Sequence, residues 1–168
     1  TGVKGPFRPW LANPAIADAA QNLGRVVRYE LSTVTPKETE MVILMTAIKN
    51  RCLSEFRIHR GEATLVGLED EIISALSDPF RDPVFMTHRE SMVYRFAQGV
   101  LEDSSKIPQD VYAKCEETLG ATALVELTSL IGYYTYVAMT LNVFEITPPA
   151  GKSGHEDQAQ AQAQAQAQ

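Results

Sequence analysis

Helix-start signals followed by apolar residues at helical spacing run along most of this sequence, and they constrain its fold more than any other feature. Thr35-Pro36-Lys37-Glu38 combines a capping box with proline at the first helical position, and Thr87-His88-Arg89-Glu90 repeats the box. Asn13-Pro14 is a third start signal. The helices predicted from these starts, the apolar periodicity and the Gly and Pro stops cover residues 14–29, 36–48, 52–65, 69–76, 88–100, 108–119 and 122–144.

The predicted fold class is therefore all-α, with about six to seven helices in one domain over residues 1–148. A chain of 168 residues is long enough to bury a core without disulfides or metals. Residues 149–168 end in alternating Ala and Gln, which have no apolar periodicity, so we expect a disordered low-complexity tail. The Gly-Lys-Ser in this tail is not a phosphate loop, because Ile146 stands where that motif needs its first glycine.

Charge and cysteine content argue against several classes of function. A net charge of −6 leaves no basic stripe for nucleic acid. Cys52 and Cys115 lie too far apart to read as a disulfide framework, and no secretory signal is visible, so we expect a reducing, cytoplasmic compartment. The apolar stretch 121–144 contains Glu126 and Asn142, so we expect a helix buried in protein, against another subunit, and no membrane span.

One predicted helix places several reactive side chains on a common side. Cys52, Glu55, His59 and Glu62 follow one another at i, i+3, i+7 and i+10. A carboxylate from Glu55 or Glu62 would favour the charged imidazolium and tune His59 for proton transfer near neutral pH. The spacing equally fits a solvated salt-bridge face, which is the commoner case. A metal is a weaker alternative, because the di-iron signature runs Glu-x-x-His and here the order is His59-x-x-Glu62.

Three stretches of the chain together resemble the carboxymuconolactone decarboxylase family, which shares its helical fold with the AhpD-type alkylhydroperoxidases. They are residues 5–14, from Gly-Pro-Phe-Arg-Pro-Trp to Asn-Pro, residues 40–67, and residues 126–144. The resemblance covers about residues 5–147 and rests on the order and spacing of these stretches. It implies a cofactor-free and metal-free enzyme that assembles into a homotrimer or homohexamer, with a small-molecule substrate drawn from aromatic-compound catabolism.

The resemblance carries over residue by residue and favours the decarboxylase branch. In the peroxidase branch a glutamate precedes a Cys-x-x-Cys pair by twelve positions and a histidine follows the second cysteine by four. Glu40, Cys52 and His59 match that pattern, but Glu55 replaces the second cysteine. A disulfide relay needs a neighbouring thiol, and Cys115 is remote in sequence. The decarboxylase branch has an aromatic-flanked Glu and a His, although it commonly has Tyr at the position of Ser54.

The resulting hypothesis is a decarboxylase or isomerase acting on a lactone or related keto acid. His59 would transfer the proton, Glu40 and Glu55 would orient or polarise, and the dienolate left by loss of carbon dioxide would need a nearby hydrogen-bond donor. Arg8, Trp10 and Arg51 are candidate substrate contacts, although such residues are more often structural. The alternatives are a thiol enzyme that uses Cys52 alone and a noncatalytic oligomer that binds a ligand.

Overall fold

A computed structural model of the chain describes residues 3–78, 80–85, 87–102 and 107–147. The described residues form helices and no strand, which confirms the all-α prediction. The predicted tail at 149–168 lies outside the described residues. The helices are α1 (Phe7–Trp10), α2 (Pro14–Tyr29), α3 (Pro36–Lys49), α4 (Leu53–Leu65), α5 (Asp70–Leu76), α6 (His88–Glu102), α7 (Gln109–Leu119) and α8 (Ala121–Val143). Each predicted helix is present, and the short α1 was not predicted.

The start signals form the hydrogen bonds that their residues predict. The Asn13 side chain accepts from the Ile16 amide at the start of α2. In the box of α3, the Thr35 amide donates to the Glu38 carboxylate at 2.8 Å and the Glu38 amide donates to the Thr35 hydroxyl at 3.3 Å. The box before α6 closes in the same way, with distances of 3.0 and 3.1 Å between Thr87 and Glu90. These bonds satisfy amides that a helix start otherwise leaves unpaired.

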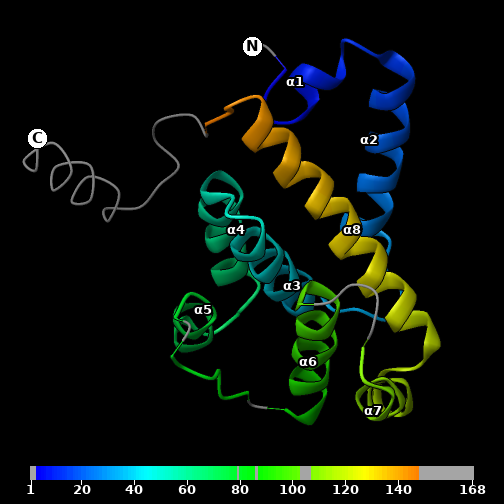
Figure 1. The fold of residues 1–168 in the computed structure, drawn as a ribbon, viewed down its shortest axis with the longest axis vertical. Coiled ribbons are helices and arrows are strands. Elements are labelled where there is room, and N and C mark those ends of the chain that lie inside the picture. The colour runs from blue at the N-terminus through cyan, green and yellow to red at the C-terminus, as the bar shows by residue number, and fades with distance from the viewer. Residues whose placement is uncertain (1–2, 79, 86, 103–106, 148–168) are drawn as a thin grey trace, which may run out of the picture.

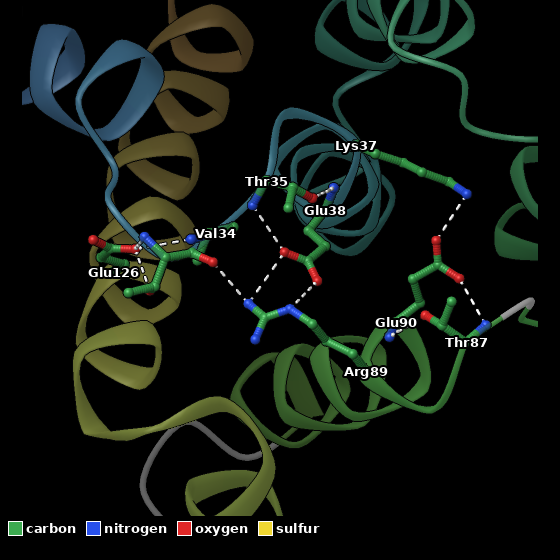
Figure 2. A network of polar contacts seen from close by, with 9 residues as sticks. Val34, Thr35, Lys37, Glu38, Thr87, Arg89, Glu90 and Glu126 are labelled. Carbon is green, nitrogen blue, oxygen red and sulfur yellow. Dashed lines mark hydrogen bonds and ion pairs between the residues drawn. The ribbon is translucent and has the colours of Figure 1, made fainter.

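The two capped helix starts are also joined to each other (Figure 2). Arg89 on α6 donates through Nε to the Glu38 carboxylate at 2.8 Å and through Nη2 to the Thr33 carbonyl at 2.7 Å. Lys37 on α3 pairs with Glu90 at 2.8 Å. Glu38 and Glu90 therefore each make two kinds of contact. Each caps the start of its own helix and also pairs with a basic side chain of the other helix.

The central helix of the fold is α3, which packs against α4, α5, α6 and α8 (Figure 1). Every residue from 38 to 47 is buried, so the apolar stripe that the sequence suggested is in fact a helix enclosed on all sides. This enclosure takes Glu38 and Glu40 out of water along with the apolar residues. Because buried carboxylates need partners, their surroundings mark the places where the core contains polar chemistry.

The long helix α8 crosses the molecule beside α2 and carries the contacts that hold the N-terminal segment (Figure 1). Trp10 stacks on Tyr136 with ring centroids 4.9 Å apart, and its indole nitrogen donates to the Thr140 hydroxyl at 3.1 Å. The Glu126 carboxylate of α8 accepts hydrogen bonds from the amides of residues 32–34 and so holds the chain that leads from α2 into α3. Among the described residues, even the longest helix, α8, lacks the apolar length that a membrane span requires.

Candidate active site

The site begins where α3 turns into α4. Arg51 adopts a left-handed backbone conformation with φ of 52°, and Cys52 is the residue that precedes the first turn of α4. Glu55 and His59 then follow one turn apart on the buried side of α4. Because α4 returns against α3, this side meets Glu40, which lies 19 residues earlier in the sequence.

His59 is held between two carboxylates. Its Nδ1 atom lies 2.8 Å from Glu40 Oε2 and its Nε2 atom lies 3.0 Å from Glu55 Oε1. The residue is only 7% exposed. A neutral imidazole has one N–H and can donate to only one of these oxygens, so the arrangement suits an imidazolium, or a neutral ring beside one protonated carboxyl group. Two carboxylates and one imidazole therefore share protons inside the protein.

The electrostatics of the site favour the charged ring. Burial alone would lower the pKa of His59, but the hydrogen bonds and negative charges of Glu40 and Glu55 outweigh it and raise that pKa above its ordinary value. For Glu40, burial alone would raise the pKa, and the hydrogen bonds and positive charges of His59 and Arg28 lower it instead. Glu40 is consequently a carboxylate at neutral pH, which fixes the Nδ1 proton of His59.

Arg28 completes this network, although it was not among the residues predicted for the site. It lies in the last turn of α2, pairs with Glu40 Oε1 and comes within 4.0 Å of Glu62 Oε2. Glu62 itself is 47% exposed in its side chain and does not contact His59 in the described structure. Its position in the sequence could have predicted an ion pair. Arg28 lies one turn after Gly24 on the buried side of an amphipathic helix, where a cation requires a partner.

A cavity of about 640 Å³ opens beside His59, between α2, α4 and α8. Glu55 and His59 line it from α4, and Tyr133 and Tyr134 line it from α8. The basic side chains of Lys4, Arg25 and Arg28 also line it. The cavity walls thus carry more positive than negative groups, although the whole chain has a net charge of −6.

Tyr134 packs edge to face against the imidazole of His59, and Tyr133 packs edge to face against Tyr134. The ring centroids of His59 and Tyr134 are 5.1 Å apart with an angle of 88° between the rings, and those of Tyr133 and Tyr134 are 5.3 Å apart at 88°. Burial raises the pKa of both tyrosines, with a further contribution from the negative charge of Glu55. Both phenols therefore keep their protons and can act as hydrogen-bond donors.

The other residues singled out in the sequence do not reach the cavity. Trp10 belongs to the core, Arg8 and Arg51 are exposed, and none of the three lines the cavity as the described residues define it. Cys52 is buried, does not line the cavity either, and burial raises the pKa of its thiol. Cys52 stands just before the first turn of α4 with its side chain in the buried core, whereas Glu55 and His59 of the same stretch line the cavity.

Two further observations concern the thiols and metal ions. Both cysteines are free and buried, and the Cys115 sulfur on α7 lies 3.6 Å from the Met92 carbonyl of α6. Within the part of the chain that the structure describes, no group of three or more His, Cys, Asp and Glu side chains is arranged to hold a metal ion.

Comparison with known proteins shows the fold. No family model and no curated protein matches this sequence. Among solved structures, the chain is similar to a protein of unknown function from Agrobacterium tumefaciens, named "Putative Antioxidant Defence Protein AhpD", with a TM-score of 0.74 and 20% identity over 88% of this chain and 99% of that one. It is also similar to an uncharacterized peroxidase-related protein from Silicibacter sp. TM1040, with a TM-score of 0.76 and 14% identity over 88% of this chain and 78% of that one. The chain therefore has the AhpD-like helical fold.

Proposed function

We propose that this chain, which has the AhpD-like helical fold, is a cofactor-free acid/base enzyme, a carboxy-lyase or isomerase that acts on a small lactone or keto acid bearing a carboxylate. One observation carries the proposal. A buried imidazole lies at the wall of a 640 Å³ cavity, with each ring nitrogen against a different carboxylate. Such a group is poised to hand a proton to a bound molecule and to recover it.

The two nitrogens of His59 have different tasks in this proposal. Glu40, itself held by Arg28, keeps the proton on Nδ1 and orients the ring. The Nε2 proton faces Glu55, whose carboxylate lines the cavity. The exchangeable proton is therefore the one between Nε2 and Glu55, and Glu40 and Arg28 are positioning residues.

In decarboxylation, the bond between the carboxylate and its carbon breaks and carbon dioxide leaves. The electron pair of that bond passes into the conjugated carbonyl, whose oxygen gains the negative charge. The proton on Nε2 of His59 then moves to carbon, and the ring recovers a proton from water. In isomerisation, the His59–Glu55 pair removes a proton from one carbon of the substrate and returns a proton to another carbon, with no net consumption of protons.

The lining of the cavity supports an anionic substrate. Lys4 and Arg25 at its edge, together with Arg28, place positive charge where a carboxylate would enter. Arg25 also pairs with Glu30 and Arg28 pairs with Glu40, so their attraction is shared with these partners. In this proposal the basic residues of the cavity wall bind the substrate in place of Arg8 and Arg51.

A thiol mechanism has less support from the geometry. A nucleophilic cysteine needs access to its substrate and a lowered pKa. Cys52 is buried, lies outside the cavity lining, and has a raised pKa.

The proposal is tested with a panel of carboxylated γ-lactones and β-keto acids in deuterated water, with carbon dioxide release and deuterium incorporation followed by NMR. The wild-type chain should turn over at least one compound, and His59→Asn and Glu55→Gln should each slow it by about 100-fold or more. His88→Asn is the matched control, because His88 is exposed at the start of α6. Turnover that survives His59→Asn, or that Cys52→Ser abolishes, would contradict the acid/base mechanism.

A further inference from the structure

Two consecutive tyrosines of α8 reach the cavity with hydroxyl groups that have no hydrogen-bond partner among the described residues. Tyr133 is 8% exposed and Tyr134 is 6% exposed. Buried tyrosine hydroxyls usually find a partner, so two unpaired ones side by side need an explanation. Among the described residues, Glu69 Oε2 is a side-chain atom that is fully buried and has no hydrogen-bond partner. The two tyrosine hydroxyls also lack partners but are not fully buried, so neither is sealed in the core.

The place of the Tyr133 hydroxyl is set by a glycine on the facing helix. A Cβ atom at Gly24 of α2 would lie 2.2 Å from the Tyr133 hydroxyl oxygen and 2.6 Å from the carbon that bears it. Atoms do not approach so closely, so any side chain at Gly24 would displace the phenol. Gly24 is part of the cavity wall, as is Arg28 one turn later.

The other polar groups around the cavity have partners or lie at its edge. Both nitrogens of His59 face carboxylates, and Arg28 pairs with Glu40. Lys4, Gln21, Asn22 and Arg25 are exposed. The buried hydrogen-bond donors of the cavity that have no partner among the described residues are therefore the hydroxyls of Tyr133 and Tyr134.

The proposed chemistry requires such a donor. Loss of carbon dioxide, or removal of a proton next to a carbonyl, moves negative charge onto the carbonyl oxygen. A hydrogen-bond donor fixed beside that oxygen stabilises the charge as it forms, and it does so most strongly where water is excluded. A neutral phenol is suited to this task because it donates without bringing a charge of its own.

We infer that the Tyr133 hydroxyl donates a hydrogen bond to the substrate oxygen that becomes negative, and that Gly24 positions this hydroxyl by leaving room for it. The inference rests on the proposed function, since it names the donor that the reaction needs. Tyr133 is thereby a catalytic residue and Gly24 a positioning residue.

The test uses 4-nitrophenolate as a probe, because its oxyanion is conjugated with an aromatic ring and its absorbance reports binding. The wild-type chain should bind it, and Tyr133→Phe should weaken binding by about 10-fold or more, as expected for loss of a hydrogen bond to a charged group. Tyr136→Phe is the matched control on the same helix, because Tyr136 stacks on Trp10 and does not line the cavity. Equal binding by wild type and Tyr133→Phe, or no binding by wild type, would overturn the inference.

A second pair of variants moves the hydroxyl without removing it. Gly24→Ala should weaken probe binding by a similar factor, whereas Gly132→Ala should not, because a Cβ at Gly132 meets nothing within 4 Å. The melting temperature of Tyr133→Phe should match that of wild type, since the lost hydroxyl has no partner in the described protein. A loss of binding that only follows a loss of stability would instead assign the tyrosine a structural role.

These measurements separate the two proposals. If His59→Asn abolishes turnover and Tyr133→Phe binds the probe as tightly as wild type, the inference about Tyr133 fails alone. If His59→Asn retains turnover, the proposed function fails whatever the probe shows.

Discussion

Replacing Glu40 with glutamine tests the network that holds His59. Glu40 is 2% exposed, lies 2.8 Å from His59 Nδ1 through one oxygen and pairs with Arg28 through the other. A glutamine of the same shape has a single acceptor oxygen, so it can serve His59 or Arg28 but not both, and its NH₂ group would face a cation. The substitution therefore removes the negative charge of Glu40 and leaves the partly buried positive charge of Arg28 without that partner.

The size of the effect follows from the burial of the pair. Removing one partner of a buried ion pair costs roughly 3–5 kcal/mol. Because the Arg28 side chain keeps 20% exposure and has Glu62 within 4.0 Å, we expect the lower end, about 3 kcal/mol. For a domain of this size each kcal/mol lowers the melting temperature by roughly 2–4 °C, so the expected fall is about 6–12 °C. Glu62→Gln is the control, and its exposed, longer contact should cost less than about 1 kcal/mol.

The same variant changes the pH dependence in a defined direction. The raised pKa of His59 means that its stabilising contribution is complete below the pKa of an unfolded histidine and is lost as pH rises through the folded pKa. The lowered pKa of Glu40 means that its contribution is present above the pKa of an unfolded glutamate and is lost as pH falls through the folded value. The network therefore stabilises the fold most between these two limits.

Two measurements decide the matter. Urea and thermal unfolding at neutral pH give the loss of stability, and an NMR titration of the His59 ring protons gives its pKa. In Glu40→Gln the pKa of His59 should fall, because burial is then opposed by Glu55 alone. An unchanged His59 pKa in the variant, or a Glu62→Gln variant as destabilised as Glu40→Gln, would show that Glu40 does not hold His59 and Arg28 in this way.

Gly24, Glu126 and Cys52 each allow a test in another part of the fold. Gly24→Ala should be less stable than Gly132→Ala by about 1–3 kcal/mol in urea unfolding, because both gain helix propensity and only the first overpacks the core; equal stabilities would contradict this. Glu126→Gln should lower the free energy of unfolding by about 1–3 kcal/mol at neutral pH. Burial would raise the pKa of Glu126, but hydrogen bonds from residues 32–33 lower it to about 2, so the difference from wild type should shrink as pH falls toward that value. A difference that is constant with pH would argue against this capping role. Cys52 should react with a disulfide reagent only as slowly as the protein opens, and a rapid reaction in the native state would show an accessible thiol.

Much of the fold could be predicted because helix signals are local. The capping boxes at Thr35 and Thr87 and the stops at Gly67 and Gly120 are written within a few residues, and both glycines have the positive φ of 84° that suits their place after a helix. The short α1 was missed because Phe7–Trp10 has no capping side chain and is held by contacts with α2 and α8.

The candidate site could be predicted only in part, because only some of its contacts join residues that are close in sequence. Glu55 and His59 stand one turn apart on one helix, so their contact follows from the sequence spacing. The contact of Glu40 with His59 spans 19 residues, and it was suggested by family resemblance rather than by spacing. Arg8 and Arg51, the basic residues expected near the substrate, are exposed and do not line the cavity, whereas Arg28 does.

Helix positions, and the residues that share a helix face, depend on neighbours within one or two turns, so they can be predicted from the chain alone. The packing of the helices brings Arg28 of α2 to Glu40, sets Tyr133 of α8 against Gly24 and encloses the Cys52 thiol in the core. These contacts could not be predicted, because the environment of a buried charge or an unpaired hydroxyl exists only after the helices have packed.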